Sequence, residues 1–225
     1  MTKTPAVIYM HGFASGPSST KAVHFDSKFK ELGIEMLIPD LNRPSFQSLT
    51  LTRQLNCVKE LIEKVEDDAP IILIGSSMGG LIATLASQTR STVAALILMA
   101  PGFGIEKRWT RLVSDEGRVA WERNGVLDVF HYATKSNQPL GYSFVKDLTN
   151  YSTQEPRVNV PALVFHGTHD EVVPFEGSAR FARANKGLVK LIEFDDGHEL
   201  IAPLDHIWSA SHAFLTEHNL LAAPQ

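Results

Sequence analysis

The stretch IILIGSSMGGLIATL, residues 71–85, places two serines and three glycines between two apolar segments. The run before Gly75 is typical of a buried strand, and the apolar residues that follow Gly79 have a helical spacing. Gly75, Ser77 and Gly79 fit the pattern G-x-S-x-G, in which a sharp strand-to-helix turn exposes the central hydroxyl. The stretch therefore predicts an elbow that presents the Ser77 hydroxyl beside a helix N-terminus, where developing negative charge is favoured.

The residues allow two other interpretations. A glycine-rich turn with a capping serine would have the same composition and no chemistry. A phosphate-binding loop is excluded as a P-loop, because no lysine follows the glycines. The choice depends on what the rest of the chain supplies.

Short apolar runs alternate with amphipathic segments along the chain. Most of the runs are continuous rather than alternating, which is typical of strands covered on both faces. Strand followed by helix, repeated, predicts an α/β protein with a mostly parallel sheet of about six strands and helices on both faces. Strands are expected over residues 6–10, 35–40, 71–75, 93–100, 162–167 and 189–194.

Five helices are expected between or after these strands. One ends at Gly33, one begins near Pro44 and Ser45 and continues to Val65, and one begins near Ser77. Two more are expected over residues 174–185 and 205–218, the last with Asp205 as its N-cap.

The segment of residues 102–156 interrupts the alternation and is too long for an ordinary connection between strand and helix. It contains several aromatic residues, and we expect a mostly helical cap over the carboxyl edge of the sheet. The chain of 225 residues is otherwise the length of one domain, so residues 1–225 are interpreted as a single domain with this insertion.

Composition excludes several functional classes. The net charge is −4 with no block of basic residues, so no nucleic-acid partner is expected. The single cysteine, Cys57, cannot form an internal disulfide. No apolar stretch approaches the ~20 residues that span a bilayer, and the N-terminal apolar run, residues 6–10, is short for a secretory signal. The sequence therefore predicts a cytoplasmic protein without a membrane span.

A serine hydroxyl needs a base, and the base needs an orienting acid. Asp170 follows the expected strand 162–167, and His198 follows the expected strand 189–194. The order Ser77, Asp170, His198 places each group after a different strand, at the edge where the carboxyl ends of parallel strands meet. These three residues are predicted to form a catalytic triad.

Other residues could fill these roles. Asp195 and Asp196 are alternative acids, but they adjoin His198 in sequence and are more typical of turn formation. His198 is preferred as the base because it follows the last strand on a loop that can reach Ser77. Three further histidines also lie near strand ends: His11, His166 and His169.

The triad chemistry also requires two N–H donors for the oxygen that becomes negative. One is expected from Met78, the residue after the serine. The other is expected from Phe13 in the stretch HGF, residues 11–13, where Gly12 lets the loop pass close to the site. Taken alone, HGF is more typical of an ordinary glycine turn than of an oxyanion loop.

The motifs HGF, GSSMGG, HGTHDEVVP and DGHEL together resemble the α/β-hydrolase superfamily, and most of all its small serine esterases and acyl-thioesterases. The resemblance implies the α/β-hydrolase fold with a cap, and it implies roles for the residues already named. Ser77 would be the nucleophile, His198 the base and Asp170 its partner, with Phe13 and Met78 as oxyanion donors. No metal or organic cofactor is implied. The HGGG loop of one lipase branch is absent, and the first expected strand corresponds to the third strand of the family's sheet.

The expected substrate is a small-molecule carboxylic ester with a short to medium acyl chain, with a thioester as the second choice. A non-catalytic ligand-binding role remains an alternative, because fold alone does not fix function. Peptidase, lyase or haloperoxidase chemistry on the same triad is also compatible with the sequence.

Overall fold

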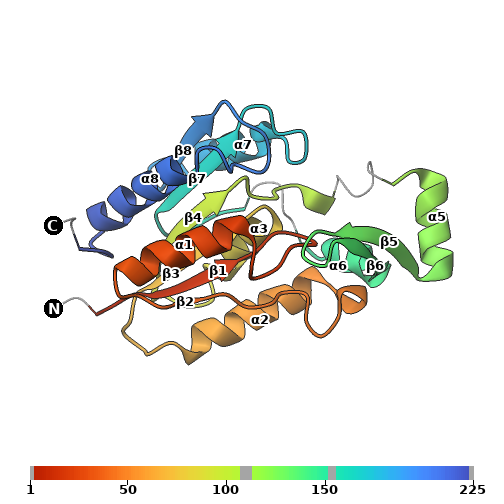
Figure 1. Cartoon of the computed structure of the whole chain (residues 1–225), viewed down its shortest axis with the longest axis horizontal. Helices are drawn as coiled ribbons and strands as arrows, with labels where there is room; N and C mark the ends of the chain where they lie inside the picture. The colour runs from red at the N-terminus through yellow and green to blue at the C-terminus, as the bar shows by residue number, and fades with distance from the viewer. Residues whose placement is uncertain (1–2, 107–112, 152–155, 223–225) are drawn as a thin grey trace.

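The computed structural model describes residues 3–106, 113–151 and 156–222. Its main feature is a parallel six-stranded sheet in the order β2-β1-β3-β4-β7-β8 (Figure 1). The strands are β1 (Ala6–Met10), β2 (Met36–Leu37), β3 (Ile71–Ser76), β4 (Val93–Met99), β7 (Ala162–Gly167) and β8 (Val189–Phe194). The prediction of a mostly parallel sheet of six strands is confirmed.

Five of the six strands lie within one residue of their predicted bounds, and β2 differs. It spans Met36–Leu37, whereas the sequence predicted residues 35–40. Pro39 has no N–H to donate to β1, and β2 lies at the edge of the sheet, so pairing with β1 stops early.

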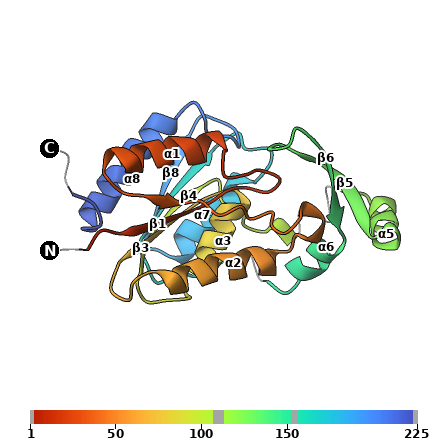
Figure 2. The same cartoon turned by 60° about the horizontal axis from the view of Figure 1, so that its bottom comes forward.

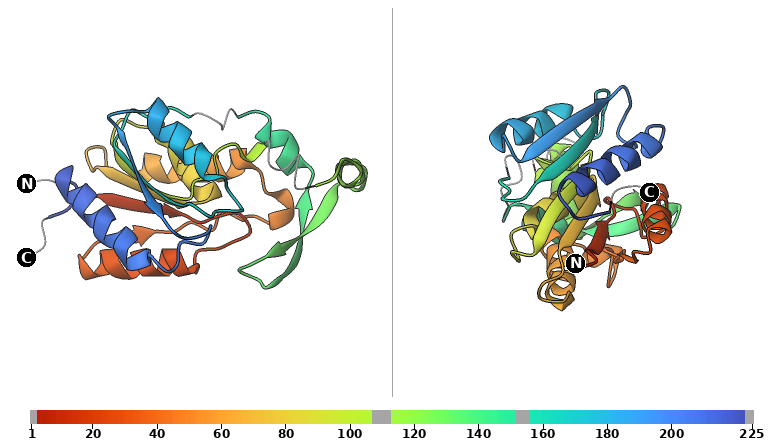
Figure 3. Two further views of the ribbon diagram at one scale, coloured as in Figure 1. Left: turned by 90° about the horizontal axis from the view of Figure 1, so that it is seen from above. Right: turned by 90° about the vertical axis from the view of Figure 1, so that its left-hand side faces the viewer.

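Helices cover both faces of the sheet (Figure 3). On one face lie α1 (Thr20–Glu31) and α8 (Leu204–Glu217), which pack on alternate strand residues such as Tyr9 and Ile74. On the other lie α2 (Leu51–Lys64), α3 (Met78–Ala86) and α7 (Phe175–Ala184), which pack on the residues between them, such as Ile8 and Leu73. Continuous apolar strands are therefore required, because both faces of each central strand are buried.

Two helix starts differ from the prediction. The helix α2 begins at Leu51, where the hydroxyl of Thr50 accepts a hydrogen bond from the Arg53 N–H. Ser45 instead caps a short 3₁₀ helix, η1 (Phe46–Ser48). The N-cap of α8 is Pro203, and Asp205 lies in the first turn, where a carboxylate complements the helix dipole.

The described part of the insertion contains an antiparallel hairpin, which was not predicted, together with the helices α5 (Asp115–Asn124) and α6 (Ser143–Leu148). The hairpin strands are β5 (Val126–His131) and β6 (Ser136–Gly141). These elements lie beyond the carboxyl ends of the sheet strands (Figure 2). Residues 107–112 and 152–155 of the predicted cap lie outside the described residues.

The described aromatic residues of the insertion differ in burial. Trp121 and Phe144 are buried and belong to the same hydrophobic cluster as Ile8 of the sheet. Phe130 and Tyr132, on and beside β5, are 50% and 69% exposed. Within the three described ranges, no helix is both long and apolar enough to cross a membrane.

Candidate active site

Ser77 lies between β3 and α3 with φ 53° and ψ −121°, a backbone conformation that residues other than glycine rarely adopt. Such a conformation costs about 1–3 kcal/mol and persists only where the surroundings enforce it. Its N–H donates to the carbonyl of Met99 on β4 at 2.8 Å, and its own carbonyl accepts from the Gly80 N–H at 2.9 Å. The predicted elbow is therefore present, held from both sides.

The two predicted elbow glycines are required by close backbone contacts. A Cβ placed on Gly75 would lie 2.2 Å from the carbonyl oxygen of Gly79. A Cβ on Gly79 would lie 2.0 Å from the carbonyl oxygen of Met10, at the end of β1. The first turn of α3 can approach β1 and β3 this closely only without side chains at these positions.

We expect Gly79→Ala to lower the free energy of unfolding by at least 3 kcal/mol, roughly the upper end of ordinary overpacking costs, because the methyl group would overlap backbone. Chemical denaturation measures the change. The matched control is Gly177→Ala in the first turn of α7, where the nearest atom to an added Cβ is 3.6 Å away. That variant should be neutral or up to about 1 kcal/mol more stable, from helix propensity. Equal stability of the two variants would contradict the packing argument.

The structure brings Ser77, Asp170 and His198 together at the carboxyl edge of the sheet. The distance from His198 Nε2 to Ser77 Oγ is 3.0 Å, and from His198 Nδ1 to Asp170 Oδ2 it is 2.7 Å. Because a carboxylate only accepts, Nδ1 carries the proton and Nε2 is free to accept the Ser77 hydroxyl proton. The geometry is that of a nucleophile, a base and an orienting acid.

Asp170 has a fully buried side chain that is surrounded by hydrogen-bond donors. Its Oδ1 accepts from the N–H groups of Val172 and Val173 at 2.8 and 2.7 Å. Burial alone raises the pKa of this carboxyl, but hydrogen bonds from His166, His198 and Val173 more than offset it, and the pKa lies well below its usual range. The carboxylate therefore stays negatively charged at neutral and moderately acidic pH.

The alternative residues occupy other environments. The exposed His169 pairs with Asp195, with 3.0 Å between Nδ1 and Oδ1. Asp196 accepts from the Gly197 N–H at 2.7 Å, as expected for a residue that shapes the turn. His11 is buried, and burial lowers its pKa. Its Nε2 accepts a hydrogen bond from the Leu41 N–H at 3.0 Å, and this bond supports the loop that follows β1.

That loop passes close to Ser77. A Cβ on Gly12 would lie 3.4 Å from the Ser77 Cβ, and the Phe13 ring packs against Phe46 and Phe144, both at 5.4 Å between ring centroids. Met78 is the first residue of α3, where N–H groups have no acceptor within the helix. Both segments predicted to supply oxyanion donors thus adjoin the serine.

Two buried residues near the triad were not assigned a role by sequence reasoning. His166, considered only as an alternative base, lies with Nε2 3.1 Å from Asp170 Oδ2. Lys21 of α1 is 8% exposed, and its ammonium donates to the carbonyl of Glu199, next to His198. Burial lowers the Lys21 pKa. A lysine on an amphipathic helix gives no sequence signal of such a contact.

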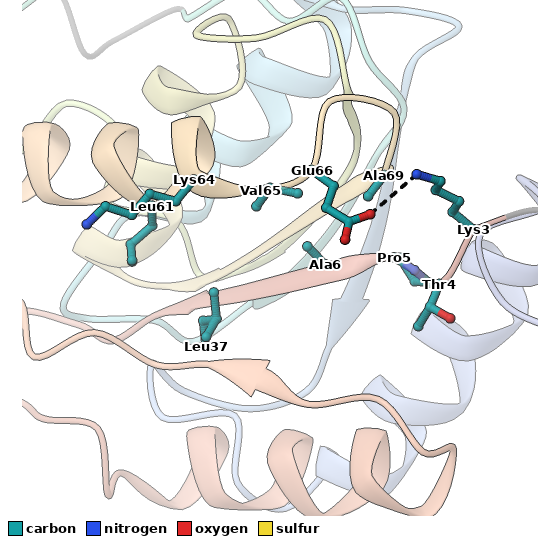
Figure 4. A pocket seen from close by; sticks show the side chains of 10 residues that line it. All are labelled: Lys3, Thr4, Pro5, Ala6, Leu37, Leu61, Lys64, Val65, Glu66 and Ala69. Carbon is teal, nitrogen blue, oxygen red and sulfur yellow. Dashed lines mark hydrogen bonds and ion pairs between the residues drawn. The ribbon is translucent and has the colours of Figure 1, made fainter.

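A cavity of about 680 Å³ lies at the amino end of β1 (Figure 4), and the triad lies at the opposite, carboxyl edge of the sheet. Its wall is mainly apolar, with Leu37, Leu61 and Val65, and an ion pair of 3.3 Å between Lys3 and Glu66 borders it. None of the candidate catalytic residues lines it. Within the described ranges, no group of three or more His, Cys, Asp or Glu residues is placed to hold a metal ion.

Residues 6–215 match the model of the uncharacterised protein family UPF0227. The chain belongs to this family. It is also a member of the α/β-hydrolase superfamily, as the resemblance in the sequence implied.

Relatives and solved structures connect this UPF0227 member to hydrolases. It is 27% identical over 189 residues to the palmitoyl-protein thioesterase ABHD10 of human mitochondria, covering 80% of this chain and 61% of that protein. The chain thus spans about three fifths of the length of that relative. Mouse ABHD10 has a similar structure, with a TM-score of 0.79, 23% identity, and 96% and 92% of the two chains covered. Est1E from Butyrivibrio proteoclasticus also has a similar structure, with a TM-score of 0.77 and 24% identity, and the match covers 97% of this chain and 90% of Est1E.

Proposed function

We propose that the protein is a serine hydrolase that cleaves carboxylic esters through an acyl-enzyme on Ser77. The observation that carries the proposal is the pair of hydrogen bonds that joins Ser77 Oγ, the His198 ring and Asp170 Oδ2, at 3.0 and 2.7 Å. The strained elbow and the buried carboxylate support it, because both are costly features that a plain strand–helix turn does not need.

In the acylation step, Ser77 Oγ attacks the acyl carbonyl carbon as His198 Nε2 takes the hydroxyl proton. The carbonyl oxygen becomes negative and is held by the N–H groups of Phe13 and Met78. The tetrahedral intermediate then collapses, His198 returns the proton to the leaving alkoxide oxygen, and the alcohol departs. Asp170 stabilises the imidazolium that exists between these two transfers.

In the second step, a water molecule replaces the alcohol. His198 Nε2 takes one proton from the water as its oxygen attacks the acyl carbon, and the same two N–H groups hold the oxyanion. Collapse returns the proton to Ser77 Oγ and releases the carboxylic acid. None of these steps needs a metal or an organic cofactor.

A thioester is the second candidate substrate, and the likeness to ABHD10, a palmitoyl-protein thioesterase, favours it. The two substrates can be separated with matched oxygen and thio esters of the same acyl groups, from acetyl to decanoyl. We expect the highest kcat/KM for oxygen esters of short to medium chains. A consistent preference for thioesters, rising with chain length, would replace the ester proposal by the thioesterase one. No turnover of either series would contradict both.

The pH dependence follows from which group takes up a proton first. The pKa of Asp170 is held far below its usual range, so this carboxylate stays charged as the pH falls. An imidazole accepts a proton at about pH 6–7, and an imidazolium cannot act as a base. We therefore expect kcat/KM to fall about tenfold per pH unit below that range, with one proton taken up. A profile that stays flat down to pH 4 would contradict the role of His198.

A further inference from the structure

His166 lies on β7, four residues before Asp170, and its imidazole is fully buried. Both of its ring nitrogens have partners. Nε2 is 2.9 Å from the Val173 carbonyl oxygen and 3.1 Å from Asp170 Oδ2, and Nδ1 is 2.7 Å from the hydroxyl of Ser178 on α7. The ester chemistry described above gives this histidine no role.

The partners of His166 fix its protons. A carbonyl oxygen only accepts, so Nε2 carries a hydrogen, and that hydrogen is shared between Val173 and Asp170. In the neutral ring, Nδ1 accepts the hydroxyl proton of Ser178, a side chain that is also fully buried. Asp170 Oδ2 therefore has two imidazole N–H groups directed at it, one from His166 and one from His198.

We propose that His166 is a positioning residue that sets the basicity of His198 by sharing the carboxylate oxygen to which His198 donates. Ser178 holds the ring of His166 from α7, which lies beside β7 and β8 (Figure 1). Hydrogen bonds therefore connect Ser178 through His166, Asp170 and His198 to Ser77. The catalytic meaning of this arrangement rests on the proposed function, whereas the effect on His198 does not.

The direction of the effect follows from charge. A donor on Oδ2 draws negative charge away from the oxygen that stabilises the His198 imidazolium. Without the His166 N–H, Asp170 becomes a stronger acceptor for His198. The carboxylate itself stays in place, because Val172 and Val173 still donate to Oδ1. Loss of the donor should therefore raise the pH at which His198 takes up a proton.

Other charged groups surround the triad and remain constant in this comparison. Lys21 of α1 lies against Glu199, with Nζ 3.7 Å from Oε2. The negative charges of Asp170 and Asp196 also attract its ammonium group. The pair of His169 and Asp195 lies on the exposed side of the two loops. A change confined to His166 leaves these groups as they are.

Two substitutions of His166 separate the hydrogen bond from the shape of the ring. His166→Phe keeps a ring and removes both nitrogens, whereas His166→Gln keeps an N–H group at the end of the side chain. The titration of the His198 ring is followed by the NMR signal of its Cε1–H, assigned with His198→Gln. We expect the midpoint to rise by about 0.5–1 pH unit in His166→Phe, as for loss of one partner of a charged group. It should stay within about 0.2 unit of the wild type in His166→Gln, since the donor is retained.

Ser178→Ala provides a second variant if His166→Phe does not fold. It leaves the imidazole in place but removes its anchor on α7, so the His198 midpoint should rise by a smaller amount. The matched control is Ser211→Ala, a fully buried serine on α8 whose hydroxyl donates to the Ile207 carbonyl at 2.7 Å. This control should leave the midpoint unchanged.

The acidic limb of kcat/KM should move in parallel with the NMR midpoint in every variant. Coincident His198 midpoints in the wild type and His166→Phe would overturn the proposal, as would an equal shift in His166→Gln. In the event that His166→Phe does not fold, an unchanged midpoint in Ser178→Ala would overturn it. A shifted midpoint in a protein that turns over no ester would support the link to His166 and contradict the proposed function alone.

Discussion

Ser77→Ala is expected to lower kcat for p-nitrophenyl butyrate by roughly 10⁴-fold or more, the scale of loss for removing a triad nucleophile. Without Oγ no acyl-enzyme can form, and only the oxyanion donors and substrate binding remain. The fold should persist, because alanine removes one oxygen and the backbone contacts of the elbow are unchanged. Steady-state kinetics and thermal unfolding measure the two effects.

The adjacent serine provides the control for this substitution. Ser76→Ala changes the same kind of side chain at the last residue of β3, one position before the elbow residue. It should keep most of the wild-type activity. A Ser77→Ala variant that kept a tenth of the wild-type rate would contradict the assignment of the nucleophile, as would a loss that followed Ser76 instead.

Asp170→Asn is expected to lower kcat/KM by about 10⁴-fold, because an amide cannot satisfy this environment in either orientation. With its NH₂ group at the Oδ2 position, asparagine would direct a donor at the N–H groups of His166 and His198. With the NH₂ group at the Oδ1 position, it would face the N–H groups of Val172 and Val173. Either arrangement places the amide NH₂ group against other N–H donors. It therefore disfavours the His198 tautomer that accepts the Ser77 proton.

The control is Asp195→Asn, an exposed carboxylate that sequence reasoning considered as an alternative acid. It should change kcat/KM by less than about twofold, as for other exposed pairs. Comparable losses in the two variants would contradict the assignment of Asp170.

Stability gives a second readout of Asp170. Its pKa is lowered by folding, so the charged form stabilises the folded state above the unfolded-state pKa of about 3.9. That contribution is lost as the pH falls below about 4 towards the folded-state value. The difference in free energy of unfolding between wild type and Asp170→Asn should therefore shrink in acid.

The main sheet could be predicted from sequence because its strands are buried on both faces. Continuous apolar runs of five to seven residues, such as Ala6–Met10 and Val93–Met99, have few other interpretations. The hairpin of the insertion lacks this signal. β6 reads SNQPLG, and only its last two residues are buried, so its pairing with β5 depends on tertiary contacts that propensity does not show.

The residues of the candidate site also differ in how far the sequence predicts them. Ser77, Asp170 and His198 follow predicted strands that end at one edge of the sheet, so their positions after these strands and their order in the sequence were enough to select them. The structure places them within hydrogen-bond distance. Their catalytic role stays a prediction. The contact of Lys21 with the Glu199 carbonyl could not be foreseen, because it joins α1 to a loop far along the chain. His166 lies only four residues before Asp170, but the direction of its ring depends on partners such as Ser178 of α7, which only the folded chain brings near.

The acyl-enzyme can be detected by mass spectrometry of the protein quenched during turnover of p-nitrophenyl butyrate. We predict one butyryl group per chain, located by fragmentation on Ser77 and absent from the Ser77→Ala variant. Turnover without any acyl group on the protein, or with the group on Ser76 or another residue, would contradict the role of Ser77 as nucleophile.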